Sequence, residues 1–223
     1  MKVGLIYTST TPELIELVER EVKKQIGEDT ELLTYTDPSI LAETREHGSV
    51  TRNAASRLIT MFLKAAQDGA EAVLNICSSV GEVADCAQDT ARYIGMPIVR
   101  IDEEMCRDAV RRGGKIGVLA TLPTTLNPTK NTILRVAREM GKEVELFDGL
   151  VDAFGLDQEQ FKDLLVNQAL ELKDKVDVIL LCQGSMAYCE ELIEEKTGKT
   201  TVSSPRYGAE ALKRALIDKG VIK

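Results

Sequence analysis

The chain has 223 residues, of which 36 are acidic and 28 basic, so its formal net charge is -8. Proteins that bind nucleic acid need a positive field for the phosphate backbone, and this composition argues against that class of partner. No apolar run reaches the roughly 18 residues that span a bilayer, so we expect no membrane segment and no membrane partner.

The first residues form a strand pattern rather than a secretion leader. The five cysteines are an odd number and lack the paired spacing of a zinc site or a disulfide framework. These features predict a cytoplasmic protein with no bound metal.

The first half of the chain alternates predicted strands and helices. Pro12 at a helix start and Gly27 just past its end delimit the first helix, which follows a hydroxyl-rich turn over 8–11. The segment 36–50 predicts a loop long enough to act as a lid, and we expect its His47 to be a solvent-exposed loop residue. The remaining predicted elements are strands over 2–7, 31–35, 72–77 and 98–101 and helices over 51–67 and 82–94.

The second half repeats this order with matching residue types. The separation between matching positions falls from 113 residues for Lys2 and Lys115 to 103 for Gly95 and Gly198, so the second half has lost residues. Its predicted elements are strands over 115–120, 143–147, 176–182 and 200–203, a turn over 121–125, a helix that ends before Gly141, and helices over 157–172 and 186–196.

This alternation predicts an α/β fold of two pseudosymmetric lobes, each a small parallel sheet flanked by helices. Ligands of such sheets bind beyond the carboxyl ends of the strands. Four loops rich in Thr, Ser and Gly lie at those ends, and if the halves face each other they line one cleft that forms the active site. A hydroxyl that caps a helix is the ordinary explanation for one such loop, but four at one edge favour an anion site.

Cys77 and Cys182 occupy the same place in the two halves, each at the end of an apolar strand. A single cysteine there is usually a packing residue, but two at equivalent positions indicate chemistry. A nearby helix N-terminus is expected to lower the thiol pKa. Two such groups suit a reaction in which one removes a proton from carbon and the other returns one from the opposite face. The other cysteines, Cys86, Cys106 and Cys189, are interpreted as packing residues.

No Gly-x-Gly-x-x-Gly or Walker pattern follows the first strand of either half, so no cofactor is expected. Three short motifs follow predicted strands: Cys77-Ser-Ser, Ala120-Thr121-x-x-Thr124, and the run from Leu181 to Met186. In these motifs the chain resembles the aspartate/glutamate/hydantoin racemase superfamily of cofactor-independent enzymes, and its hydantoin-racemase-like branch most closely.

The resemblance implies that Cys77 and Cys182 are opposed acid/base residues acting on a small carboxylate or hydantoin-like substrate. It implies that the substrate is held by Thr8, Ser78, Ser79, Thr121, Thr124, Gln183 and Gly184. It also implies a first lobe over 1–99 and 206–223, a second lobe over 100–205, and a homodimer or higher homo-oligomer. Substrate specificity is expected to come from the loops 36–53 and 148–156.

The chain departs from glutamate racemases at two places. It has Thr8-Ser9-Thr10 where they have Asp-Ser-Gly, and it has no histidine in its second half, which argues against free glutamate or aspartate as the substrate.

Three alternatives to a racemase stay open. A maleate-isomerase-like enzyme would use one cysteine as a nucleophile, and an arylmalonate-decarboxylase-like enzyme would need only the second. A two-lobed chain could also be a small-molecule binding protein without catalysis, although such a protein has no need of paired thiols.

Overall fold

The computed structural model describes residues 1–153 and 156–223. The chain folds as two compact units, one formed by Met1–Asp102 with Pro205–Lys223 and the other by Glu103–Ser204. None of the described helices is both long and apolar enough to cross a membrane. Each unit holds a four-stranded parallel sheet flanked by helices, which confirms the predicted fold class.

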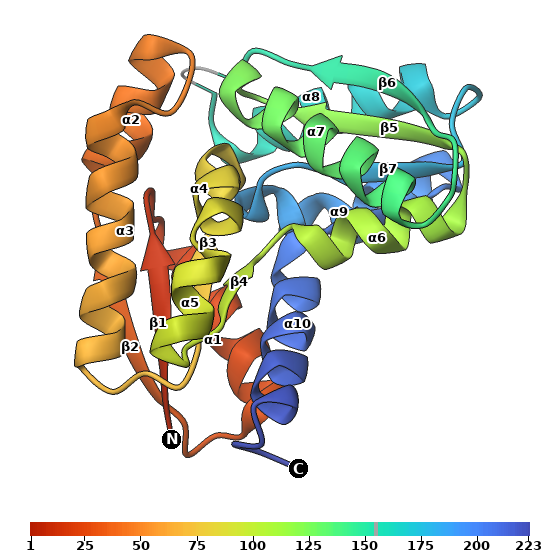
Figure 1. Cartoon of the computed structure of the whole chain (residues 1–223). Coiled ribbons are helices and arrows are strands. Elements are labelled where there is room, and N and C mark those ends of the chain that lie inside the picture. The colour runs from red at the N-terminus through yellow and green to blue at the C-terminus, as the bar shows by residue number, and fades with distance from the viewer. Residues whose placement is uncertain (154–155) are drawn as a thin grey trace. The chain divides into compact units, whose positions relative to one another are not determined.

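The first unit contains a sheet of order β2-β1-β3-β4, in which every neighbouring pair is parallel. Its chain order is visible in Figure 1, from red through yellow, with the last helix in blue. The elements are β1 (Lys2–Tyr7), α1 (Pro12–Ile26), β2 (Glu31–Thr36), α2 (Pro38–His47), α3 (Arg52–Gln67), β3 (Val73–Ile76), the 3-10 helix η1 (Ser78–Val80), α4 (Gly81–Cys86), α5 (Gln88–Ile94), β4 (Ile98–Arg100) and α10 (Ser204–Asp218).

Helices cover both faces of this sheet because its inner strands are apolar on both sides. On β3, Val73 faces a core formed with α2, α3, α4 and α5, while Leu74 and Ile76 face a second core formed with α1 and α10. Figure 1 shows α3 and α10 on opposite sides of β1 and β3. Asn75 and Cys77 follow the period of two and lie on the α3 side.

The second unit repeats the topology with sheet order β6-β5-β7-β8. The helix α8 and the segment around α9 pack against one face of the sheet, and α6 and α7 contact the inner strands β5 and β7 (Figure 1). Its elements are α6 (Glu103–Arg112), β5 (Lys115–Ala120), α7 (Pro123–Glu139), β6 (Glu145–Leu150), α8 (Gln158–Leu172), β7 (Val178–Leu181), the 3-10 helix η2 (Gly184–Cys189), α9 (Glu190–Thr197) and β8 (Thr200–Ser203).

The structure corrects the predicted lid loop over 36–50. That segment contains α2, which begins with Pro38 at its first position and with the Asp37 side chain accepting a hydrogen bond from the Ser39 N–H. The helix ends at Gly48, which has a left-handed φ of 71°. The same kind of start signal, a proline at the first helical position, predicted the first helix of the chain. It was overlooked here because apolar residues recur only weakly at helical spacing in this segment.

Two further predictions need correction. The single helices expected over 82–94 and 186–196 are each divided, into α4 and α5 after η1, and into η2 and α9. The strand expected over 143–147 is shifted, because β6 pairs with β5 from Glu145 to Leu150 and the ladder imposes strand geometry on Asp148 and Gly149. The predicted specificity loop 148–156 therefore starts inside β6, and its residues 154–155 lie outside the described part of the chain.

Two glycines at equivalent positions of the first strands give a matched test of packing. A Cβ at Gly4 would lie 2.9 Å from Val73 Cγ2 and 3.1 Å from Ala65 Cβ, whereas a Cβ at Gly117 would meet Leu172 Cδ1 at 3.4 Å. We expect Gly4→Ala to lower the free energy of unfolding by about 1–3 kcal/mol through overpacking, and Gly117→Ala to change it by much less. Urea unfolding followed by circular dichroism measures both variants, and equal destabilisation would contradict this account.

Candidate active site

Cys77 directly follows β3, an inner strand of the first sheet, and precedes η1. Tyr7 at the end of β1 pairs with Ile76 at the end of β3, so the residues that follow these strands emerge side by side. The buried Thr8 hydroxyl lies close enough to the Cys77 thiol to lower its pKa, yet it forms no hydrogen bond of ordinary geometry with any described residue. The predicted neighbours Ser78 and Ser79 are buried in η1.

The sequence predicted a lowered pKa for Cys77, and the structure reverses that direction. Burial raises the pKa of the Cys77 thiol; the Thr8 hydroxyl and the backbone N–H groups of Ser79 and Val80 offset only part of the rise, and the Asp102 carboxylate adds to it. The helix that follows Cys77 is η1, of three residues, so the dipole the prediction relied on is short. The thiol form of Cys77 is therefore favoured at neutral pH.

A buried ion pair contacts the Cys77 loop through a hydrogen bond between Ser78 and Asp102. The Arg100 guanidinium donates two hydrogen bonds to Asp102, both of 2.9 Å, and a third of 2.5 Å to Asp85. The side chains of Arg100 and Asp102 are 3% and 1% exposed, so this is an interior pair and not a surface one. Burial alone would raise the pKa of Asp102, but the Arg100 charge and a hydrogen bond from the Ser78 hydroxyl lower it, and the carboxyl is ionised.

The second unit places different groups around Cys182. This buried cysteine directly follows β7, and its N–H donates to the Leu119 carbonyl at 2.9 Å. The next residue, Gln183, bridges to the loop after β5: its Oε1 accepts from the Thr121 N–H at 3.0 Å, and its Nε2 donates to the Thr121 hydroxyl at 2.5 Å. The structure thus brings Cys182, Gln183 and Thr121 together within the second unit.

The remaining predicted substrate-binding residues of this unit lie close by in sequence. Gly184 begins η2. Thr124 lies in the first turn of α7, and its buried hydroxyl finds no hydrogen-bond partner among the described residues. Each unit therefore carries a buried threonine hydroxyl shortly after its first strand, Thr8 beside the Cys77 thiol in one and Thr124 in the other.

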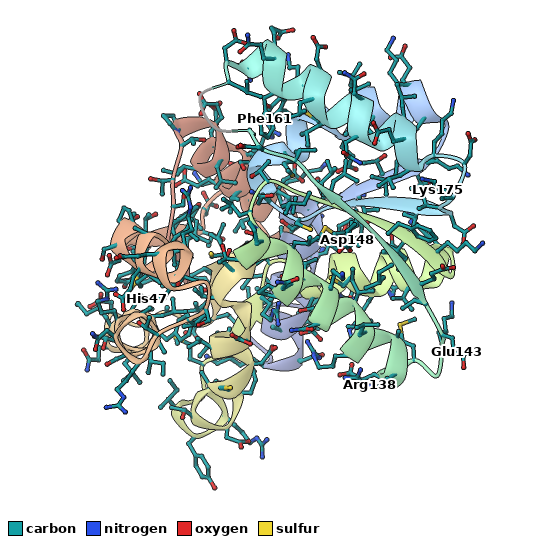
Figure 2. All side chains as sticks on the ribbon, turned by 90° about the horizontal axis from the view of Figure 1, so that it is seen from above. His47, Arg138, Glu143, Asp148, Phe161 and Lys175 are labelled. Carbon is teal, nitrogen blue, oxygen red and sulfur yellow. The ribbon has the colours of Figure 1, made fainter. Side chains whose placement is uncertain are left out.

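The histidine and the other cysteines lie elsewhere. His47 is exposed at the end of α2, and Figure 2 shows it at the periphery of the first unit; it belongs to a helix and not to the predicted loop. Cys106 and Cys189 are buried as packing residues, as expected. Cys86 is exposed, so the prediction that it packs was wrong.

Sequence analysis missed the charged residues that support Cys77. Arg100 and Asp102 are two residues apart at the end of a strand that is otherwise apolar, and such residues point to the same side of a strand. A charge at an interior strand position needs a partner, and an oppositely charged residue at this spacing supplies one. That signal was present in the run from Ile98 to Asp102.

The bridge between Gln183 and Thr121 gives a second matched test. Gln183→Met removes both hydrogen bonds and leaves the Thr121 N–H without its acceptor, so we expect a loss of about 1–3 kcal/mol in the free energy of unfolding. Thr121→Val removes only the side-chain bond and should cost about 1 kcal/mol. A double-mutant cycle in urea separates the two bonds, and additive losses would show that the side chains are not coupled.

The chain matches a known protein family over most of its length. The sequence model of the Asp/Glu/Hydantoin racemase family matches residues 3–212. A comparison with curated proteins finds no significant match.

Solved structures of this fold are similar over almost the whole chain. An allantoin racemase from Klebsiella pneumoniae has a TM-score of 0.68 at 18% identity and covers 99% of this chain and 89% of its own. A glutamate racemase from Bacillus anthracis has a TM-score of 0.73 at 19% identity, and the match covers 98% of this chain and 82% of the racemase. An arylmalonate decarboxylase has a TM-score of 0.60 at 16% identity, and the match covers 96% of this chain and 92% of the decarboxylase. Identities this low show the fold alone, whereas the family model covers most of the sequence, and the chain therefore belongs to the Asp/Glu/hydantoin racemase family of isomerases.

Proposed function

We propose that this protein is a cofactor-independent racemase or epimerase that uses Cys77 and Cys182 for acid/base proton transfer at carbon. The observation that carries the proposal is the matched position of the two cysteines. Each directly follows the inner strand that pairs with the first strand of its sheet, β3 or β7, and each is followed within two residues by a 3-10 helix. In a family of racemases, two thiols at matched positions are the natural pair of acid and base.

The reaction needs a base and an acid at a carbon next to a carbonyl or carboxylate. One cysteine, as the thiolate, takes the carbon-bound proton, and the electron pair moves into the adjacent carbonyl to give an enolate. The other cysteine, as the thiol, gives its proton to the opposite face of the same carbon. Afterwards the two have exchanged protonation states, so the pair is set for the other enantiomer.

The substrate is proposed to be a small carboxylate or a hydantoin-like ring. Neutral donors suit the oxygen that gains charge in such an enolate. The Thr124 hydroxyl supports its assignment as one of these donors, because a buried polar group without a partner is costly unless a ligand completes it. The buried Thr8 hydroxyl is proposed as a second donor because it lies beside the Cys77 thiol. Ser78, Ser79, Thr121, Gln183 and Gly184 are proposed to complete the binding residues.

Deuterium exchange tests the proposal and identifies the substrate class. The protein is incubated in heavy water with a panel of hydantoins, amino acids, hydroxy acids and substituted malonates, and incorporation at the stereogenic carbon is measured by mass spectrometry. We expect one deuteron to be gained without loss of carbon dioxide. Cys77→Ala and Cys182→Ala should each lower the rate of inversion by about 10²-fold or more, because each removes one of the two proton-transfer groups.

The exposed Cys86 supplies the control, since Cys86→Ala removes a thiol outside the proposed machinery and should leave the rate unchanged. Loss of carbon dioxide from the malonates, dependent on Cys182 alone, would replace the racemase with a decarboxylase. Conversion of a substrate without exchange at a stereogenic carbon would point to the isomerase instead. Binding without conversion of any compound would leave a binding protein.

A further inference from the structure

The ionic cluster of Arg100, Asp102 and Asp85 has no counterpart of the same kind among the described residues of the second unit. The strand register defines equivalent positions: the residue two places before the cysteine pairs with Arg100 in the first sheet and with Val202 in the second. Two residues further along, the same rule matches Asp102 with Ser204. Valine and serine thus occupy the positions of the ion pair, and the buried Ser204 hydroxyl makes no hydrogen bond with the described residues.

The space for the guanidinium is also specific to the first unit. Gly81 and Met186 each lie four residues after their cysteine. A Cβ at Gly81 would lie 2.5 Å from Arg100 Nη2, so the guanidinium occupies the room left by the missing side chain. Met186 fills the equivalent position and is fully buried in the apolar core of its unit. One acidic position is shared, since Asp85 matches Glu190, which accepts a hydrogen bond from Ser203.

We propose that Asp102, clamped by Arg100, is a positioning residue for Cys77: it fixes the loop through Ser78 and places a buried carboxylate near the thiol, which opposes a second negative charge there. The proposal rests on the assignment of Cys77 as a catalytic residue. It makes Cys77 the proton donor toward the enantiomer whose carbon-bound proton faces Cys182, whereas the opposite enantiomer requires Cys77 to ionise first. The two thiols of the pair are then unequal before substrate binds.

The charges around Cys77 support this role for Asp102. Asp102 is the charged group whose field acts on the thiol. Arg100 is bound by two carboxylates, Asp102 and Asp85, and of these two only Asp102 contributes to the raised pKa of Cys77. The other ionisable groups on the elements packed against the loop are Tyr7 on β1, Glu43, Arg45, Glu46 and His47 on α2, and Glu82 and Cys86 on α4.

The pH dependence of alkylation tests the proposal. Iodoacetamide reacts with the thiolate, and mass spectrometry of peptides reports Cys77 and Cys182 separately in one sample. In Asp102→Asn we expect the midpoint for Cys77 to fall and its alkylation at pH 7 to become several-fold faster, while Cys182 keeps its profile. Asp85→Asn is the matched control: it also removes one carboxylate from Arg100, but not the one that acts on Cys77, and its profile should stay near that of the parent.

A double variant guards against misfolding of Asp102→Asn. Arg100→Val with Asp102→Ser installs the residues of the second unit and removes both charges of the buried pair together, while Asp85, 34% exposed, keeps access to water; it should lower the Cys77 midpoint in the same way. Equal shifts in Asp85→Asn and Asp102→Asn would overturn the proposal, because they would indicate general loosening of the loop. An unchanged midpoint in both Asp102 variants would overturn it as well. Since alkylation needs no substrate, a shift seen in a protein that racemises nothing would count against the proposed function and not against the role of Asp102.

Discussion

The parallel pairing of the first and third strands in each half, β1 with β3 and β5 with β7, is the interaction on which both candidate half-sites depend. Because parallel strands end at the same edge, this pairing sets Thr8 beside Cys77 and Thr121 beside Gln183. It requires both strands to be buried on both faces, and that explains their apolar runs. Gly4 belongs to the same arrangement, since it lets α3 and β3 approach β1 closely.

The two halves use this common frame in different ways. In the first half the buried pair of Arg100 and Asp102 holds the Cys77 loop through Ser78, while in the second half the neutral amide of Gln183 joins the residue after Cys182 to Thr121. A buried ion pair is weak evidence for stability, because desolvation consumes much of the attraction, and an apolar replacement often folds as well. At the matching register positions the second half has Val202 and Ser204, so the pair is more simply explained by chemistry at Cys77 than by folding. A racemase with unequal thiols still inverts both hands, but it begins from one protonation state.

The sequence was sufficient for the doubled architecture and for the position of both cysteines, because apolar periodicity and helix boundaries recur in both halves. It failed where a tertiary contact overrides a local pattern. Pairing with β5 made a strand of Asp148 and Gly149, and burial outweighed the short helix beside Cys77, reversing the expected direction of its pKa. The support of Cys77 by Asp102 depends on a strand register, and nothing along the sequence links these residues, which are 25 positions apart.

The central claim, that two groups and not one carry the proton, is tested most directly by the isotope content of both enantiomers during the first turnovers in heavy water. Starting from one pure enantiomer, a two-base enzyme places solvent deuterium in the product while the unconverted substrate keeps its protium. We predict this pattern from either hand of the substrate. Protium carried from substrate into product, or deuterium that enters the substrate as fast as the product, would show that a single group works on both faces and would contradict the account.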